Sequence, residues 1–257
     1  MIPATIMHTQ ALQDLLTLSH EIGREDRGLA ILGEGNTSVR LSDDTFGVKA
    51  SGTCRGTLKT EDVVECRLSS LLPLLDKESL TDQQVDDALM ASRVDSKAKK
   101  PSVEAVFHAS LLSLPGIKFV GHGHATTVNQ ILCSPRAREF AEHRMFPDEI
   151  VCCSVASVFV PYTDPGLKLA QVVRQQTDAF IKKYQRQPRI ILMQNHGVIA
   201  LGGSWQAVLS ALLMAEKAAK VFVGAAVLGG PVFFTEENVA RIAGRPDEAY
   251  RQRALKL

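Results

Sequence analysis

The chain has 257 residues, of which 45% are hydrophobic and 22% charged, and its formal net charge is +1 at pH 7. This composition excludes a disordered chain, and the near-neutral charge gives no basic excess of the kind that nucleic-acid-coating proteins carry. Because no linker, repeat or low-complexity tract interrupts the sequence, we expect one domain over residues 1–257.

The N-terminal segment predicts a cytoplasmic protein that begins with a helix. MIPATIMHTQALQDLL lacks the basic segment, the apolar segment and the small-residue cleavage site of an export signal. The apolar residues Leu12, Leu15, Leu16 and Ile22 recur at helical spacing, and Gly23 ends the pattern.

The next segments alternate between glycine turns, strands and helices. GEGNTSVR (33–40) is typical of a turn that enters a strand, and FGVKASGT (46–53) of a strand that runs into a second turn. A polar helix is expected within residues 76–100. PSVEAVFHASLLSLPG (101–116) then predicts a helix with Pro101 in its first turn and Val103 on its apolar face.

The C-terminal half predicts two strand regions and two long helices. VCCSVASVFV (151–160) and RIILMQNHGVIALGG (189–203) have the length and β-branched content of strands. Residues 166–184 and 204–228 show helical periodicity, and charged residues within the second helix argue against a membrane span. The mixture indicates one α/β or α+β domain, and its five cysteines form no CxxC metal pair.

Two histidines follow an apolar run in KFVGHGHATT (118–127). On a strand, His122 and His124 would leave the same face about 6.5–7 Å apart, so both rings could bind one ion. Gly121 and Gly123 would occupy the other face and allow a helix or backbone to approach closely. The alternative is two polar residues at a strand end with unrelated hydrogen bonds.

A third histidine strengthens the metal hypothesis. His196 lies in QNHG, again after an apolar strand and before a glycine. Taken alone it is typical of a turn. Together with His122 and His124 it would give three nitrogen ligands and an open position, the arrangement of catalytic zinc.

Glu104 is the candidate acid or base. It lies in the first turn of the helix predicted over residues 101–116, where a glutamate also complements the helix dipole without any other role. In a dry metal site the same carboxylate could bind the cation or move a proton.

The glycine turns and the start of this helix could bind an anion through backbone N–H groups and polar side chains. The candidate residues are Gly35, Asn36, Lys49, Ser51, Gly52 and Ser102. The alternative is that each turn is only a turn. Neither the GxGxxG fingerprint nor a P-loop is present, so the sequence gives little support for nucleotide binding.

Six motifs occur in an order that resembles the class II aldolase/adducin superfamily: GEGNTSVR, KASGT, PSVE, GHGH, PYTDPG and NHGVIALG. The resemblance extends from about residue 10 to 228. It implies a three-layer α/β/α fold with a central, mainly antiparallel sheet. It also implies a homotetramer with sites near subunit contacts and a divalent cation, usually Zn²⁺, with Mn²⁺ as an alternative.

The resemblance also implies roles for individual residues. His122, His124 and His196 would bind the metal, and Glu104 would serve as acid/base and as a ligand in the empty enzyme. A phosphate would be held by Asn36, Ser51, Gly52 and Ser102, with Lys49 as an added charge. Val103 departs from the family motif because it replaces a second serine, and Tyr162 is a candidate for proton handling or substrate contact.

These expectations point to reversible aldol cleavage of a ketose, in particular a sugar phosphate, through a metal-stabilised enediolate. Decarboxylation of a 3-oxo sugar acid and 4-epimerisation of a sugar phosphate use related chemistry and stay open. A non-catalytic interaction module, as in the adducin branch, predicts degraded metal ligands, whereas all four candidate ligands are present here. We expect a small sugar or sugar-acid substrate and no nucleic-acid or membrane partner.

Overall fold

The fold is built around one sheet of seven strands, in the order β3-β2-β1-β4-β7-β6-β5. The computed structural model describes residues 4–254, so residues 1–3 and 255–257 of the predicted domain lie outside it. The strands are β1 (Asn36–Arg40), β2 (Thr45–Lys49), β3 (Val63–Arg67), β4 (Phe119–Gly123), β5 (Val158–Val160), β6 (Ile190–Met193) and β7 (Gly197–Gly202). All neighbours pair antiparallel except β5 and β6, so the predicted mainly antiparallel sheet is confirmed.

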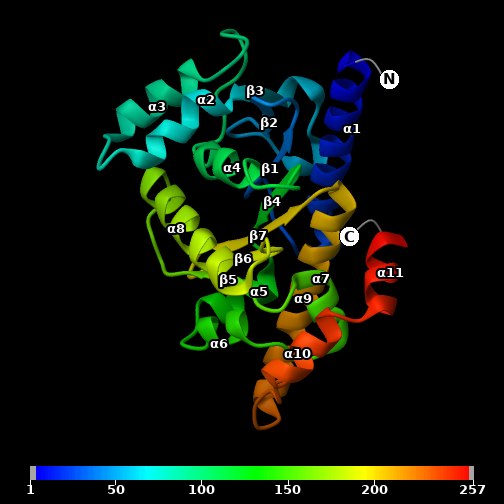
Figure 1. The fold of residues 1–257 in the computed structure, drawn as a ribbon. Coiled ribbons are helices and arrows are strands. Elements are labelled where there is room, and N and C mark those ends of the chain that lie inside the picture. The colour runs from blue at the N-terminus through cyan, green and yellow to red at the C-terminus, as the bar shows by residue number, and fades with distance from the viewer. Residues whose placement is uncertain (1–3, 255–257) are drawn as a thin grey trace.

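Helices cover both faces of this sheet (Figure 1). They are α1 (Ala4–Ile22), α2 (Leu68–Leu71), α3 (Asp82–Ala91), α4 (Ala105–Leu112), α5 (Thr126–Leu132), α6 (Ala137–Glu142), α7 (Pro147–Cys153), α8 (Leu167–Tyr184), α9 (Trp205–Val227), α10 (Glu236–Ala243) and α11 (Pro246–Ala254). Helices α4 and α8 pack on one face, and α1 and α9 on the other. No helix within residues 4–254 is long and apolar enough to cross a membrane.

The alternating side chains of β7 join the two halves of the core. Ile199 and Leu201 belong to the cluster under α4 and α8, whereas Val198 and Ala200 belong to the cluster under α1 and α9. Because successive strand residues point to opposite faces, a strand buried on both sides is apolar at every position. The sheet is therefore the middle of three layers, as the family resemblance implied.

The helix predicted from Pro101 begins later, at Ala105. Pro101 instead forms a β-bridge with Ala50, and Ser51 N–H donates to the carbonyl of Lys100. This pairing extends the chain before the helix, and Val103 is 42% exposed rather than part of the apolar face. The pairing also brings the second glycine turn next to the start of α4.

The strand predicted over residues 151–160 is wrong for most of its length. Residues 151–153 end helix α7, which has Pro147 in its first turn, and only Val158–Val160 form a strand. The buried guanidinium of Arg144 binds the carbonyls of Cys153 and Ser154, which holds the chain where the helix ends. This contact from a residue outside the predicted strand outweighs the strand propensity of the valines and cysteines.

The expected close approach at the strand glycines is confirmed. A Cβ added to Gly121 would lie 2.8 Å from Val208 of α9, and one added to Gly123 would lie 2.7 Å from the carbonyl oxygen of Leu29. Both distances are too short for a real side chain, so α9 packs directly on the backbone of β4 at Gly121 and the loop backbone at Leu29 does so at Gly123. The other face of β4 is left for His122.

We predict that Gly35→Ala destabilises the protein more than Gly52→Ala. Both glycines have positive φ angles, 60° and 74°, so each alanine incurs a similar backbone cost. At Gly35 the added Cβ would also lie 2.3 Å from the His122 carbonyl oxygen, whereas at Gly52 nothing lies within 4 Å. The extra loss in the free energy of unfolding should be about 1–3 kcal/mol, measured by urea titration. Equal losses would contradict the close packing of this turn on β4.

Candidate active site

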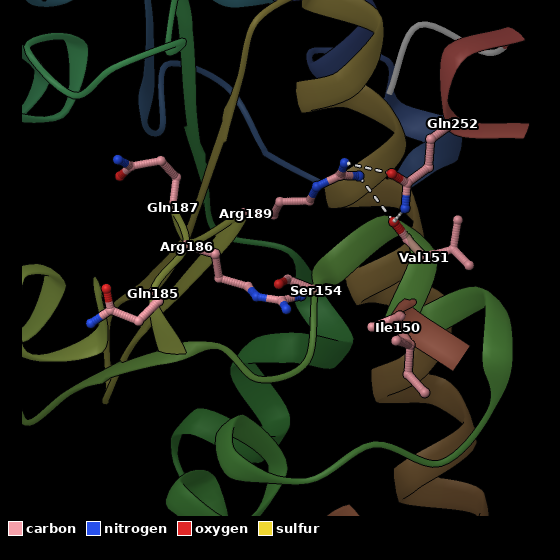
Figure 2. Close-up of a pocket in the computed structure, with 9 residues that line it drawn as sticks. Ile150, Val151, Ser154, Gln185, Arg186, Gln187, Arg189 and Gln252 are labelled. Carbon is pink, nitrogen blue, oxygen red and sulfur yellow. Dashed lines mark hydrogen bonds between the residues drawn. The ribbon is translucent and has the colours of Figure 1, made fainter. Parts of the chain in front are cut away.

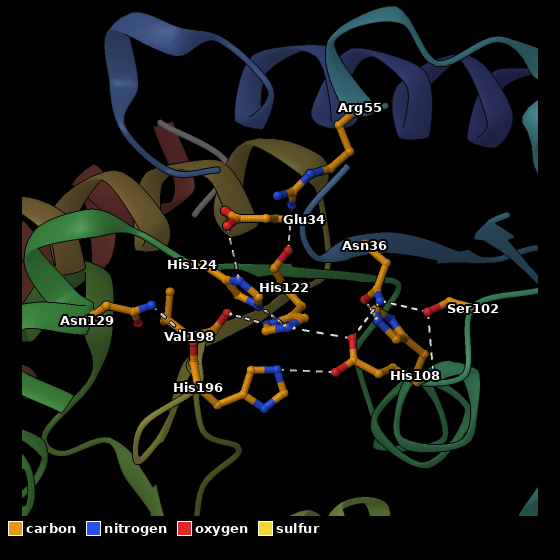
Figure 3. Close-up of polar contacts among 11 residues, drawn as sticks. Glu34, Asn36, Arg55, Ser102, His108, His122, His124, Asn129, His196 and Val198 are labelled. Atoms are coloured by element: carbon orange, nitrogen blue, oxygen red, sulfur yellow. Dashed lines mark hydrogen bonds and ion pairs between the residues drawn. The ribbon is translucent and has the colours of Figure 1, made fainter. Parts of the chain in front are cut away.

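Three histidines converge at the ends of adjacent strands (Figure 3). His122 lies on β4, His124 follows the end of that strand, and His196 lies in the turn between β6 and β7. Their potential ligand nitrogens all lie within 4.8 Å of one another, and the Nε2 atoms of His122 and His124 are 3.2 Å apart. We call these residues the histidine cluster.

Gly197 makes room for the rings. A Cβ at this position would lie 2.8 Å from Cδ2 of His124 and 3.1 Å from Cε1 of His122. The same Cβ would lie 2.6 Å from the carbonyl oxygen of Gly123, so the backbone of β4 and the two other imidazoles together require a glycine after His196. This gives a physical reason for the histidine–glycine pair in the NHG motif.

His122 has the tautomer that a metal requires. Its Nδ1 lies 3.0 Å from the carbonyl oxygen of Val198, which can only accept, so Nδ1 carries the proton. Nε2 is then a free lone pair that faces the cluster. Burial lowers the pKa of His122 to about 3, so the ring is neutral at pH 7.

Glu104 lies beside the cluster at the N-cap of α4. Its Oε1 is 3.3 Å from Nε2 of His196, and its Oε2 is 3.5 Å from Nε2 of His122. The Asn36 amide donates to Oε2 at 2.7 Å. Burial alone would raise the pKa of this carboxyl, but the two imidazoles and the Asn36 amide outweigh burial and hold the pKa well below its usual range. Glu104 is therefore ionised.

The predicted anion-binding residues divide into two groups. Asn36 donates to the hydroxyl of Ser102 at 2.9 Å, so these two lie together next to Glu104. Lys49 is buried, but its ammonium donates to the carbonyls of Ala50 and Thr53 at 3.2 and 2.6 Å. Its charge is thus directed into its own turn, and burial lowers its pKa.

The remaining predicted residues lie at the surface. Ser51 and Gly52 are exposed in the second glycine turn. Tyr162 is 57% exposed, and its hydroxyl donates to Asp164 at 2.9 Å. Within the described residues, Tyr162 makes no hydrogen bond or ring contact with the histidine cluster.

Three residues near the cluster escaped the sequence analysis. Glu34 Oε1 lies 3.8 Å from Nδ1 of His124 (Figure 3), whereas Glu104 lies beside His122 and His196. Arg55 is fully buried and donates through Nη1 to the carbonyl of His122 at 2.5 Å. His108 is fully buried on α4 and contacts Asn36. Only His108 gave a signal, because it follows Glu104 by one helical turn.

The cavity drawn in Figure 2 lies away from these residues. Its volume is about 290 Å³, and the groups that line it come mainly from the segment before β6 and the end of α7. Arg189 in this cavity precedes β6, whereas His196 follows that strand. The cavity and the histidine cluster therefore lie at opposite ends of β6, and the cavity adds no group to the candidate site.

A mainly antiparallel sheet between two helical layers, with imidazoles gathered at strand ends, defines an α/β protein of the class II aldolase type. Residues 13–223 match the Class II Aldolase and Adducin N-terminal domain family. The chain belongs to this family.

Individual relatives are distant. The chain is 26% identical over 201 residues to the uncharacterized oxidoreductase YuxG of Bacillus subtilis (strain 168), a match that covers 75% of this chain but 27% of YuxG. It is 27% identical over 186 residues to a 3-oxo-tetronate 4-phosphate decarboxylase of Haemophilus influenzae, covering 71% of this chain and 74% of that protein. An L-fuculose 1-phosphate aldolase structure has a TM-score of 0.69 at 18% identity, covering 94% of this chain and 96% of that one, which shows the shared fold.

We predict that the metal-free protein loses stability as the pH falls from 6.5 toward 4. Burial lowers the pKa of His122 to about 3 and that of His108 to about 4, so both rings stay neutral in the fold. In the unfolded chain they take up protons at a pKa of about 6.5. The unfolded state therefore binds more protons in this window, and stability rises with pH.

Urea titrations in the presence of a chelator, at several pH values between 4.5 and 7.5, measure this slope. His122→Asn removes one of the two titrating rings, so its slope should be shallower by about 1.4 kcal/mol per pH unit below pH 6. Comparing the slopes of the variant and the wild type removes the contribution of the surface carboxylates, which is the same in both proteins. A slope unchanged by the substitution would mean that His122 is protonated in the native protein.

Proposed function

We propose that this protein is a metal-dependent carbon–carbon lyase that reversibly cleaves a ketose, with sugar phosphates as the substrate class. The observation that carries the proposal is the geometry of four side chains. The histidine cluster offers three nitrogens within 4.8 Å of one another, and both oxygens of Glu104 lie within 3.5 Å of cluster nitrogens. A non-catalytic interaction module would have lost some of these ligands, whereas all four side chains are present here.

The donor set fits a divalent cation with an open coordination position. His122 is neutral with its Nε2 lone pair free, and burial also lowers the pKa of His124, which favours the neutral ring. Three imidazoles and a carboxylate suit zinc and also accept Mn²⁺. A bound cation would supply a Lewis acid that stabilises negative charge on the oxygens of the substrate.

Glu104 would move the proton. It is ionised, 8% exposed and held by the Asn36 amide, so it presents a fixed acceptor beside the cluster. A carboxylate in this position could take the proton from a substrate hydroxyl as the carbon–carbon bond breaks and deliver it to the carbon next to the carbonyl. In the synthetic direction it would take that carbon-bound proton and return it to the new hydroxyl. Exposed Tyr162 is a second candidate for proton handling or substrate contact. As part of the same proposal, the enzyme would be a homotetramer and would act in the cytoplasm.

The substrate anion would lie against Asn36, Ser102 and the second glycine turn at Ser51 and Gly52. Lys49 would add a positive charge behind this turn, where its ammonium donates to the Thr53 carbonyl. Val103 supplies no hydroxyl here. A single hydroxyl-to-anion hydrogen bond contributes about 1.5–3 kcal/mol, so its loss weakens phosphate binding without abolishing it.

Decarboxylation of a 3-oxo sugar acid phosphate is the second candidate function. It is favoured by the likeness to the Haemophilus influenzae decarboxylase, which covers 74% of that protein at 27% identity. Loss of CO₂ and aldol cleavage both leave negative charge on the same substrate oxygens, so the same four side chains serve either reaction. An epimerase would use cleavage followed by rejoining.

A screen of ketose phosphates and 3-oxo sugar acids with zinc-loaded protein tests the proposal. Aldehyde and CO₂ are followed separately, because their release distinguishes a lyase acting on ketoses from a decarboxylase. Aldehyde release from a ketose phosphate is the expected result. Release of CO₂ alone would favour the decarboxylase over the aldolase. If neither aldehyde nor CO₂ is released, both candidate functions are wrong.

We predict that Glu104→Gln lowers exchange of deuterium at the carbon next to the substrate carbonyl by about 10²–10⁴-fold. The amide keeps the shape of the side chain but cannot accept the proton. Zinc content should remain measurable, because the three imidazoles are unchanged. Glu34→Gln is the matched control, a carboxylate 3.8 Å from His124, and should keep exchange within about tenfold of wild type. Undiminished exchange in Glu104→Gln would exclude it as the base.

A further inference from the structure

A buried chain of hydrogen bonds leads from β1 and α4 to Glu104, and Figure 3 shows its central residues, His108 and Asn36. The Ser38 hydroxyl lies 2.6 Å from Nδ1 of His108, and Nε2 of His108 forms a short hydrogen bond with Oδ1 of Asn36. The other end of the Asn36 amide donates to Oε2 of Glu104 at 2.7 Å and to Ser102 at 2.9 Å. We call Ser38, His108, Asn36 and Glu104 the amide chain, and each is at most 8% exposed.

With a neutral His108 ring, only one arrangement of protons satisfies these contacts. The Glu104 carboxylate accepts, so the Asn36 NH₂ group must face it, and Oδ1 of Asn36 must face His108. Because Oδ1 only accepts, His108 carries its proton on Nε2 and donates. Nδ1 is then a lone pair that accepts from the Ser38 hydroxyl. Burial lowers the pKa of His108 to about 4, which agrees with a neutral ring.

The reverse orientation of the amide would be unfavourable. It would place Oδ1 of Asn36 against Oε2 of Glu104, two acceptors in a buried site with no proton between them. The carboxylate therefore sets which way the amide points, and the N–H of His108, which donates to Oδ1, holds the amide in that orientation. The amide in turn holds Oε2 of Glu104, which lies 3.5 Å from His122, and leaves Oε1 3.3 Å from His196.

We propose that His108 is a positioning residue for Glu104, acting through the Asn36 amide to hold the carboxylate between His122 and His196. This inference rests on the proposed function for the role of Glu104. It assigns His108 no contact with substrate or cation. The alternative is a core histidine whose hydrogen bonds serve only the stability of the fold.

The spacing of these residues in the sequence explains how they meet. Glu104 and His108 are four apart around the beginning of α4 and share one side of it. Asn36 and Ser38 are two apart on β1 and share one face of the sheet. Thr37 between them points to the other face, where its hydroxyl lies 2.6 Å from that of Ser19 on α1. Thr37 is therefore a matched control for Ser38.

The test compares His108→Phe with His108→Gln. Phenylalanine removes the donor, whereas the glutamine amide can still donate to Oδ1 of Asn36. We expect His108→Phe to lower kcat by about 10–100-fold with little change in KM, and His108→Gln to recover most of this loss. In an Asn36→Ala background, His108→Phe should have no further effect on kcat. The proposal would be overturned if the losses in kcat from Asn36→Ala and His108→Phe multiplied in the double variant. It would also be overturned if His108→Phe and His108→Gln lowered kcat equally.

A second readout needs no activity and no metal. In ¹⁵N-labelled, metal-free protein at pH 7, the His108 ring should show a proton on Nε2 and none on Nδ1. Ser38→Ala should weaken this preference, whereas Thr37→Val should leave both the tautomer and kcat unchanged, although it also deletes a buried hydroxyl. A proton on Nδ1 in the wild type would refute the positioning role. If the His108 ring shows the expected tautomer but the protein has no lyase activity, the proposed function is refuted instead.

Discussion

The structure depends on bringing three imidazoles to one point at the ends of antiparallel strands. His122 pairs with Ile199 across β4 and β7, and this register places the turn that bears His196 beside it. A side chain at Gly197 would collide with the Gly123 carbonyl and with the His124 ring. Burial keeps the His122 ring neutral, and the Val198 carbonyl fixes its proton on Nδ1. Packing, register and tautomer thus act together to leave nitrogen lone pairs facing one another.

The surrounding elements hold the cluster from two sides. On one face, α4 brings Glu104 and β1 brings Asn36, which fixes the carboxylate against His122 and His196. On the side of the first glycine turn, the buried guanidinium of Arg55 binds the main-chain carbonyl of His122. These contacts join segments far apart in the sequence, so the site depends on the folded sheet rather than on any single loop.

Much of this arrangement follows from the sequence, and the exceptions have physical causes. The paired histidines, the glycine turns and the apolar strands have local signals in spacing and composition, and they predicted the sheet and the meeting of the rings. The helix start at Ala105 and the strand start at Val158 were missed, because contacts from outside each segment decide them. Pro101 pairs with Ala50, and the buried Arg144 binds the carbonyl that follows α7. Arg55 gave no signal, since an arginine in a polar loop is usually exposed.

The central claim is that His122, His124 and His196 hold one cation together. X-ray absorption at the zinc edge of the zinc-loaded protein tests it most directly. We expect three imidazole nitrogens at about 2.0–2.1 Å, completed by oxygen, with the imidazole signal reduced when any one of the three is replaced by alanine. A sulfur shell at about 2.3 Å, or a spectrum with fewer than three imidazoles, would contradict it.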